Sequence, residues 1–434
     1  MQTYQDVVCT VCGCLCDDIE VDVDGNKVMK ARNACAMGTS KFLSYTHDRI
    51  ETPMVRKNGS TQPANLDEAV TKVAEMLVNA KYPAIYGLAL SSCEAVKVAI
   101  ELTEEVGGVM DNQSVVCHGP GVLGLHEIGV STCSLGEIKH RADLIICWGC
   151  NPDEAHPRHF ERYSYTAKGR WRNGKADRKL VVVDVRQTST ARKADKFVQI
   201  DQGKDYELVN ALRTALRNEQ IQQEKVAGVP VEDIEELAEL LRNAEFGVIL
   251  FGLGVTQTVG KGRNIDGLFS LTRDLNKYTK FQIMPARGHF NVNGVNEVSA
   301  WQTGFPYGID FSHGYPWYNP GETTVTDIVR RGENDAMLVI ASDPIAHFPK
   351  DLANRIRKSP LAAIDPVHSV TTMVADVVIP SAFAGIECEG IAYRMDGVAL
   401  PLKKVVEPSQ GVLSDEDILK KILGKVRELK GRSG

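Results

Sequence analysis

Long hydrophobic runs are missing from this sequence of 434 residues, and no uninterrupted apolar stretch is long enough to cross a bilayer. The first residues, MQTYQDVVCTVCGC, lack a basic region followed by an apolar core, and they contain no twin arginine. Excess positive charge is missing too, since the formal net charge is −6. We therefore expect a cytoplasmic protein that binds neither nucleic acid nor membrane.

The composition is that of a soluble globular protein, with 43% hydrophobic and 24% charged residues. The length predicts two or three domains. The reducing cytoplasm disfavours structural disulfides. We therefore expect the eleven cysteines of this chain to bind metal or to take part in catalysis rather than to form disulfides.

Five of the eleven cysteines lie within the first fifty residues, at positions 9, 12, 14, 16 and 35. Between them, IEVDVDGNKVMKA alternates apolar and polar residues around Asp24 and Gly25, which is a strong hairpin signal. Residues 1–54 are therefore predicted to form a small β-rich lobe with a metal centre.

From about Pro83 onward, short apolar runs such as KLVVVDV alternate with helical stretches such as DYELVNALRTALRN. This pattern predicts an α/β fold with doubly wound, mainly parallel sheets. We expect one discontinuous α/β domain over 55–112 and 246–412, a second over 113–245, and a C-terminal helix and tail over 413–434. Several strands end in small or turn residues, and ligands bind beyond the carboxyl ends of such strands.

The first candidate site consists of Cys9, Cys12, Cys16 and Cys35, with the spacing C-x2-C-x3-C followed by eighteen residues and a further cysteine. Four thiolates can hold a [4Fe-4S] cluster or a structural zinc ion, and the spacing favours the cluster. Cys14 is interpreted as an inert neighbour inside the motif.

The second candidate site is Cys117 and His118, in VVCHGPGVLGLHEIG, together with Arg287, in PARGHFNVNGVN. Taken alone, such a pair is more often a buried thiol beside a structural histidine than a metal site. The planar fork of Arg287 is suited to holding a carboxylate by two hydrogen bonds, although a structural ion pair is the more frequent role of arginine.

Taken together these motifs resemble the molybdopterin oxidoreductases that bind two pterin guanine dinucleotides. The likeness covers nearly the whole chain in order: the cysteine motif, RIETPMVRKNG, GCNPDEAHP, VVVDVRQTSTARKAD, FGLGVTQ and ADVVIP. It implies that the dinucleotides are bound by Gly149, Asn151, Pro152, Asp184, Arg186, Gly252, Gly254, Asn291, Asn293, Asp343, Asp365 and Asp376.

Within that family, Cys117-His118 and RGHFNVNG resemble the corresponding motifs of formate dehydrogenases. Those enzymes usually carry a C-terminal pterin-binding β-barrel, whereas this chain stops soon after IECEGIAYRMDGVALPLKKV. The chain thus resembles the B subunits of formylmethanofuran dehydrogenases. The resemblance implies an amidohydrolase subunit, a small pterin-binding barrel subunit and ferredoxin-like subunits as partners.

The resemblance also implies a mechanism. Tungsten or molybdenum would be held by pterin sulfurs, the Cys117 thiolate and an inorganic sulfide, with electrons reaching it through the [4Fe-4S] cluster. Carbon dioxide would be reduced to formate, with Arg287 stabilising charge on the oxygens and His118, through a pKa near neutrality, donating a hydrogen bond or moving a proton.

One position departs from the family: many members have a lysine two residues after the fourth cysteine, where this chain has Met37, and Lys41 is the nearby candidate. The remaining histidines, His156 and His159 among them, are interpreted as scattered and structural. Three alternatives stay open: a stand-alone formate dehydrogenase, a non-catalytic iron–sulfur scaffold, and a zinc-containing enzyme without pterin.

Overall fold

The computed structural model describes residues 1–431 and divides the chain into two compact units. Unit 1 contains Met1–Val115, His289–Arg394 and the chain from Ala399 onward, and unit 2 contains Val116–Gly288 with Met395–Val398. Within residues 1–431, no helix combines the length and the apolarity needed to cross a membrane. Residues 432–434, the end of the expected C-terminal tail, lie outside the described part of the chain.

The amino-terminal residues of unit 1 form the predicted β-rich lobe. Strands β1 (Gln2–Val7), β2 (Ile19–Asp24) and β3 (Lys27–Arg32) make an antiparallel sheet, followed by helix α1 (Ala36–Leu43). Gly25 occupies the β2–β3 turn with a φ of 58°, a conformation that glycine adopts without strain. The connection between β1 and β2 carries Cys9, Cys12, Cys14 and Cys16.

Unit 1 is built on a nine-stranded sheet in the order β16-β15-β7-β6-β17-β18-β19-β4-β5. Its five central strands, from β7 to β19 in that order, are parallel. Each is a continuous run of mostly apolar, buried residues, as expected for a sheet that helices cover on both faces. Its strands are β4 (Met54–Lys57), β5 (Ser60–Pro63), β6 (Pro83–Gly87), β7 (Val109–Asp111), β15 (Ile309–Asp310), β16 (Trp317–Tyr318), β17 (Ala336–Ile340), β18 (Leu361–Asp365) and β19 (Val377–Pro380).

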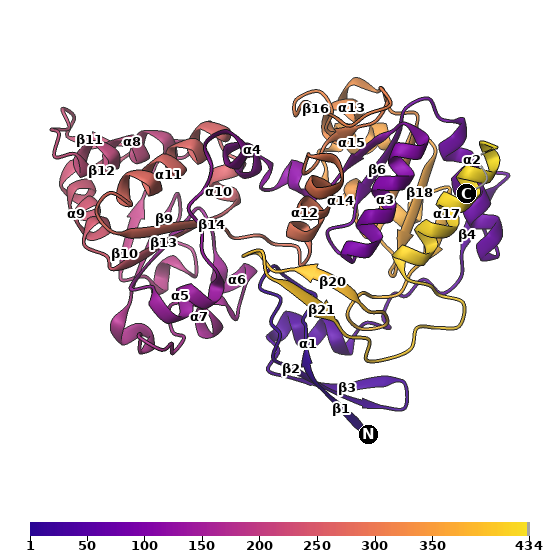
Figure 1. Cartoon of the computed structure of the whole chain (residues 1–434), viewed down its shortest axis with the longest axis horizontal. Helices are drawn as coiled ribbons and strands as arrows, with labels where there is room; N and C mark the ends of the chain where they lie inside the picture. The colour runs from indigo at the N-terminus through magenta and orange to yellow at the C-terminus, as the bar shows by residue number, and fades with distance from the viewer. Residues whose placement is uncertain (432–434) are drawn as a thin grey trace. The chain divides into compact units, whose positions relative to one another are not determined.

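Helices α2, α3 and α17 run side by side in unit 1 and bury a shared apolar core (Figure 1). The expected C-terminal helix is α17, and it packs on α2 and α3 as part of this unit. The helices of unit 1 after α1 are α2 (Leu66–Asn79), α3 (Cys93–Val106), α12 (Val292–Thr303), α13 (Val325–Arg331), α14 (Pro344–His347), α15 (Lys350–Ile356), α16 (Val370–Val374) and α17 (Asp415–Leu429).

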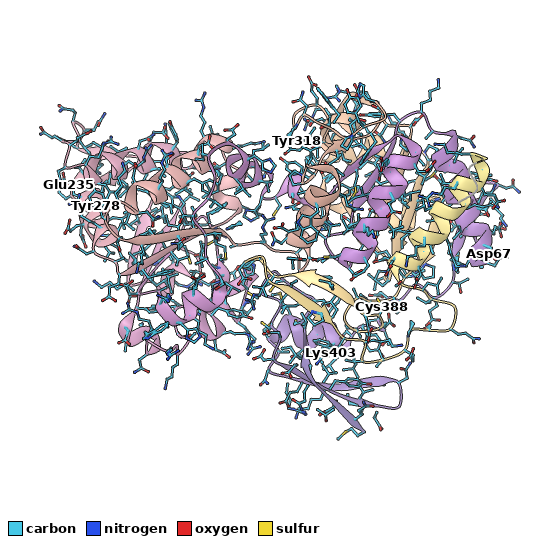
Figure 2. The ribbon with its side chains drawn as sticks, viewed as in Figure 1. Asp67, Glu235, Tyr278, Tyr318, Cys388 and Lys403 are labelled. Carbon is cyan, nitrogen blue, oxygen red and sulfur yellow. The ribbon has the colours of Figure 1, made fainter. Side chains whose placement is uncertain are left out.

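Two features complete unit 1. At one sheet edge, Tyr318 (labelled in Figure 2) stacks on Phe305 with ring centroids 4.9 Å apart. A separate antiparallel hairpin pairs β20 (Gly390–Tyr393) with β21 (Ala399–Leu402).

Unit 2 contains a five-stranded sheet in the order β10-β9-β8-β13-β14, and all its strand pairs are parallel. Its strands are β8 (Leu144–Trp148), β9 (Lys179–Asp184), β10 (Lys196–Gln199), β13 (Phe246–Phe251) and β14 (Lys280–Pro285), with a small hairpin of β11 (Lys225–Val226) and β12 (Val229–Pro230). Its helices are α4 (Gly119–Ile128), α5 (Leu135–Arg141), α6 (Pro152–Ala155), α7 (His159–Arg162), α8 (Asp205–Leu216), α9 (Val231–Arg242), α10 (Leu253–Thr256) and α11 (Gly262–Leu275).

The structure groups the segments differently from the expected domain division. We expected residues 246–412 to share one domain with 55–112, but β13 pairs with β8 and β14 pairs with β13. Residues 246–288 therefore belong to unit 2. The α/β class and the parallel doubly wound sheets are confirmed. The boundary expected at residue 246 lies instead after residue 288, because β13 and β14 pair within the sheet of unit 2.

Candidate functional site

The cysteine motif forms one compact loop in unit 1. The amide of Cys9 donates to the carbonyl of Cys16 at 2.9 Å, and the amide of Leu15 donates to the carbonyl of Cys12 at 3.0 Å. Burial raises the pKa of the Cys9 thiol, and the charges of Cys16, Cys12 and Cys35 raise it further. The four predicted cluster ligands are thus close enough to interact electrostatically.

Cys35 joins this loop from the start of α1. It is the N-cap residue of the helix, and its sulfur accepts from the amide of Gly38 at 3.4 Å. A Cβ atom at position 38 would lie 3.1 Å from the sulfur of Cys9 and 3.8 Å from that of Cys35, so glycine leaves space beside both thiols. As the side chains stand, no group of three or more His, Cys, Asp or Glu residues within 1–431 is arranged to hold a metal ion.

Cys14, interpreted from sequence as inert, is in contact with the motif. A hydrogen bond from Cys14 is the largest influence on Cys12, and it lowers the pKa of the Cys12 thiol. Cys14 itself is buried, and the same contact raises its pKa.

Lys41 lines a pocket of unit 1 and follows Cys35 in helix α1. Its ammonium lies 4.0 Å from the ring centroid of Phe383. Burial lowers the pKa of Lys41 to about 8, although the charges of Asp365 and Cys9 act in the opposite direction. The candidate for the missing lysine of the family therefore lines the pocket and lies within electrostatic range of Cys9.

This pocket has a volume of 210 Å³ and lies at the carboxyl ends of the parallel strands of unit 1. The chain runs β6, β7, β17, β18, β19 while the sheet order is β7-β6-β17-β18-β19, so the winding reverses between β6 and β17. Asp343, Asp365, Lys41, His289 and His347 are among the lining residues. Burial raises the pKa of Asp365 to about 7.

Three other residues predicted to bind cofactor in unit 1 have different positions. Asp376 precedes β19 at the amino end of the strand, where it pairs with Arg56 at 3.1 Å, so it lies at the edge opposite the pocket. Asn291 is buried and accepts from the amide of Tyr393 at 2.8 Å, and Asn293 donates to the carbonyl of Arg394 at 3.2 Å. These amide side chains form hydrogen bonds with the backbone of residues 393 and 394, and they do not line the pocket.

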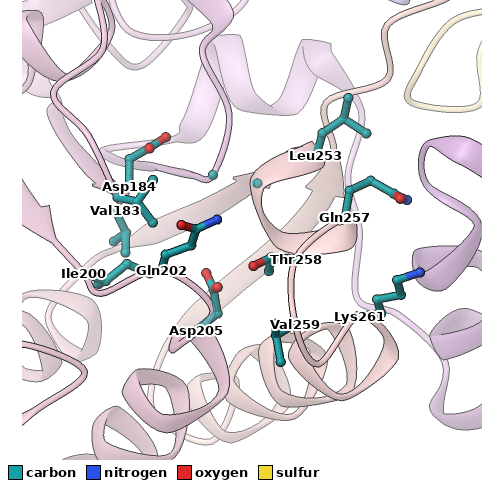
Figure 3. Close-up of a pocket in the computed structure, with 13 residues that line it drawn as sticks. Val183, Asp184, Ile200, Gln202, Asp205, Leu253, Gln257, Thr258, Val259 and Lys261 are labelled. Carbon is teal, nitrogen blue, oxygen red and sulfur yellow. The ribbon is translucent and has the colours of Figure 1, made fainter. Parts of the chain in front are cut away.

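A pocket of unit 2 has a volume of 480 Å³ (Figure 3). In sequence order the strands run β8, β9, β10, β13, β14, so the winding reverses between β8 and β13, and the pocket lies beyond their carboxyl ends. Of the predicted residues, Gly149, Asp184 and Gly254 line it. Figure 3 also shows Gln202, Asp205, Thr258 and Lys261 around it, which the sequence did not single out.

The other predicted residues of these loops do not line the pocket. Asn151 accepts from the Thr190 hydroxyl at 2.6 Å, and Pro152 begins α6. Arg186 is exposed, and its amide donates to the Asp184 carboxylate at 3.2 Å. A Cβ on Gly252 would lie 2.5 Å from the Gly149 carbonyl oxygen, so this position requires glycine.

Cys117, His118 and Arg287 all belong to unit 2, although Cys117 and Arg287 are 170 residues apart in the sequence. All three are buried. Burial raises the pKa of Cys117 to about 11, although the charge of Arg287 lowers it, so the guanidinium and the thiol lie within electrostatic range of each other. The predicted grouping of thiol, imidazole and guanidinium is present.

His118 differs from expectation in one respect. Burial, and then the charge of Arg287, lower its pKa to about 3 rather than leaving it near neutrality. Its Nε2 lies 3.2 Å from the carbonyl oxygen of Ala286, and its Nδ1 is buried with no hydrogen-bond partner in residues 1–431. The ring is therefore neutral and donates through Nε2.

Further residues of this site were missed from the sequence. Thr256 Oγ1 and Gln257 Nε2 both donate to the carbonyl oxygen of Cys117 at 2.8 Å. His156 Nε2 lies 2.7 Å from the carbonyl oxygen of Arg287. The one available signal was that these residues lie in the motifs FGLGVTQ and GCNPDEAHP, because nothing local relates them to Cys117 or Arg287.

Comparisons with known proteins show which family this chain belongs to. Residues 49–425 match the family model described as molybdopterin oxidoreductase. The chain is 49% identical to the B subunit of tungsten-containing formylmethanofuran dehydrogenase 2 of Methanocaldococcus jannaschii and 46% identical to that of Methanococcus maripaludis, in both cases over 99% of this chain and 100% of the relative. Among solved structures, the formyltransferase/hydrolase complex (FhcABCD) from Methylorubrum extorquens in complex with methylofuran matches with a TM-score of 0.71 and 24% identity, covering 88% of this chain and 100% of the matched chain.

Proposed function

The chain belongs to the molybdopterin oxidoreductase family, and from this premise we propose that it is the catalytic subunit of a formylmethanofuran dehydrogenase. In that role it takes part in the two-electron reduction of carbon dioxide to formate, which a partner subunit condenses with methanofuran. The observation that carries the proposal is the buried grouping of Cys117, His118 and Arg287 in a chain that resembles these B subunits over its whole length.

The residues present fit a metal cofactor that contains two pterin guanine dinucleotides. Each unit has a pocket at the carboxyl ends of its parallel strands, which is where α/β sheets bind nucleotides. The Cys117 thiol is a soft ligand suited to tungsten or molybdenum, and the partnerless Nδ1 of His118 is a buried polar atom that nothing in residues 1–431 satisfies. When bound, the metal with its pterins and an inorganic sulfide would supply two-electron redox chemistry.

We propose a [4Fe-4S] cluster on Cys9, Cys12, Cys16 and Cys35. The mutual electrostatic influence of the four thiols supports it, as does the glycine that leaves space beside two of them. Lys41, which is influenced by Cys9 and lines the 210 Å³ pocket, is proposed to lie between the cluster and one pterin.

The chemistry assigned to the chain's own side chains is binding and charge stabilisation. Arg287 holds the formate oxygens, on which negative charge builds as carbon dioxide is reduced. His118 keeps its proton at Nε2, on the Ala286 carbonyl, so Nδ1 is the atom that can accept a hydrogen bond. Burial of all three side chains keeps water from competing for these contacts.

The proposed partners are an amidohydrolase subunit, a small pterin-binding barrel subunit and ferredoxin-like subunits, in a cytoplasmic complex. Both tungsten-containing relatives are named as one subunit of a larger enzyme, and the structural match is part of the FhcABCD complex. These names support an assembly of several different chains.

Metal and turnover measurements on the purified complex test the proposal. We expect tungsten or molybdenum, iron, and formate oxidation with a viologen dye. Cys117→Ala should abolish that turnover and leave the iron content unchanged, while Cys133→Ala, at a buried thiol of the same unit, is the matched control and should retain turnover. A fully assembled complex without tungsten or molybdenum would instead support the iron–sulfur scaffold.

A further inference from the structure

A buried histidine outside the predicted catalytic group holds the backbone that carries Arg287. His156 Nε2 lies 2.7 Å from the carbonyl oxygen of Arg287, and His118 Nε2 lies 3.2 Å from the carbonyl oxygen of Ala286. Two imidazoles therefore contact two successive carbonyls, and both belong to the same unit as the arginine.

The remaining backbone groups of this segment are also fixed. The amide of Ala286 donates to Phe251 in β13 at 2.8 Å, and the amide of Arg287 donates to Pro285 at 3.0 Å. With both amides and both carbonyls engaged, the peptide planes on either side of the Arg287 Cα are fixed. These contacts set the direction of the Cα–Cβ bond by which the Arg287 side chain leaves the backbone.

The geometry also settles which nitrogen of His156 carries the proton. A carbonyl oxygen only accepts, so Nε2 must be the protonated nitrogen in this contact. Burial lowers the pKa of His156, which keeps the ring neutral, and its Nδ1 has no hydrogen-bond partner within residues 1–431. The side chain is 3% exposed, so water does not compete for the bond.

His156 is also tied to the 480 Å³ pocket through its own segment. It ends the short helix α6, where its amide donates to Pro152 at 2.8 Å. Residue 149, which lines the pocket, lies at the end of β8 just before this helix. The same segment thus lines the pocket at one end and holds the arginine backbone at the other.

We propose that His156 is a positioning residue that aims the Arg287 guanidinium at the formate oxygens by donating from Nε2 to the Arg287 carbonyl. This rests on the proposed function for the role of Arg287 itself. The neighbouring His159 provides the contrast: it is equally buried, but its Nδ1 contacts the hydroxyl of Ser164 at 2.9 Å, a local bond five residues away.

The test compares His156→Leu, His156→Gln and the matched control His159→Leu in the purified complex. The leucine variant loses the donor, and we expect kcat/KM for formate to fall about 10- to 100-fold, with metal, iron and pterin contents unchanged. A glutamine amide at this position reaches the same carbonyl, so H156Q should recover most of the loss. His159→Leu should stay within about twofold of the wild type.

A double-mutant cycle and amide exchange separate positioning from general damage. In the Arg287→Ala background, His156→Leu should cause no further loss of turnover, because its effect passes through the missing guanidinium. Hydrogen–deuterium exchange of a peptide spanning 286–288 should be faster in H156L than in wild type and unchanged in H159L.

The proposal is overturned if H156L matches wild type, if the losses of H156L and R287A are additive, or if H156Q is as impaired as H156L. A wild-type complex that oxidised no formate would refute the proposed function instead, and the exchange comparison would still decide whether His156 holds the segment.

Discussion

The backbones of Gly149 and Gly254 lie in direct contact: the amide of Gly254 donates to the carbonyl of Gly149 at 2.9 Å, and a Cβ on Gly254 would lie 2.8 Å from the Gly149 Cα. Gly149 also has a φ of 56°. The loops after β8 and β13 approach so closely because both residues lack side chains, and both residues line the 480 Å³ pocket.

Gly254→Ala should separate these two loops. Because the added methyl group meets backbone, which cannot give way cheaply, we expect a loss of about 1–3 kcal/mol in unfolding free energy and a lower pterin content. Gly262→Ala is the control, since a Cβ there meets nothing within 4 Å. Thermal melts and fluorescence of the released, oxidised pterin measure both effects. Wild-type pterin content in the Gly254 variant would separate this contact from cofactor binding.

Arg287→Lys should reduce the oxidation of formate with a viologen dye at least about tenfold, because a point charge cannot make two parallel hydrogen bonds to a carboxylate. The surface substitution Arg330→Lys, at a residue that is 62% exposed, is the control. Steady-state kinetics over a range of formate concentrations measure the effect. Turnover equal to wild type would remove Arg287 from the proposed chemistry.

Gly38→Ala should reduce the iron content of the chain. Alanine is favoured over glycine in a helix by about 1 kcal/mol, so a purely structural position would gain stability. Here the Cβ would lie 3.1 Å from the Cys9 sulfur, which crowds the proposed cluster ligands. Gly136→Ala in α5, whose nearest neighbour would be the Ser134 hydroxyl at 3.6 Å, is the matched control. Iron analysis and visible absorbance should fall only in the Gly38 variant.

Asp365 predicts a pH dependence of stability. Its folded-state pKa of about 7 lies above the ordinary value of 3.8, because burial disfavours the charged form. The folded state then binds more protons than the unfolded state between these values, so this group's contribution is lost as pH rises from about 4 to about 7.

Asp365→Asn should remove this loss. The melting temperature of the variant minus that of the wild type should therefore increase between pH 5 and pH 8. Asp67→Asn on the exposed surface of α2 (Figure 2) is the control, and its difference from wild type should stay flat. A flat profile for Asp365→Asn as well would contradict the raised pKa.

Arg49 and Glu387 form a buried ion pair at 2.7 Å, with side chains 6% and 4% exposed. Glu387→Gln leaves the guanidinium of Arg49 buried without its counter-charge, and we expect a loss of roughly 3–5 kcal/mol in unfolding free energy. Glu75→Gln breaks the exposed Lys72–Glu75 pair and should change it by less than about 1 kcal/mol. Equal melting temperatures for the two variants would show that burial of the pair does not matter.

Local pattern was sufficient for several features. The Asp24-Gly25 hairpin and the parallel α/β class follow from short-range periodicity, and the structure contains them. The structure also places Cys12, Cys16 and Cys35 within electrostatic range of Cys9. Glycines at the ends of strands likewise pointed to the pocket of unit 2, because the close approach of two loops requires them.

Long-range pairing decided the rest. Whether 246–288 belongs with the segments before it or after it depends on which strand β13 meets. Asp376 was assigned from the family resemblance, which did not show on which side of the sheet the residue lies; it precedes β19 and is therefore at the amino end of the strand.

The sequence by itself determined the kinds of chemistry this protein can carry, since thiols, imidazole and guanidinium are properties of residues and their spacing. Only the tertiary structure decided which of them cooperate. His156 reaches the Arg287 carbonyl across 131 residues, and burial holds His118 neutral. Both effects arise from the packing of distant segments, which no local pattern encodes.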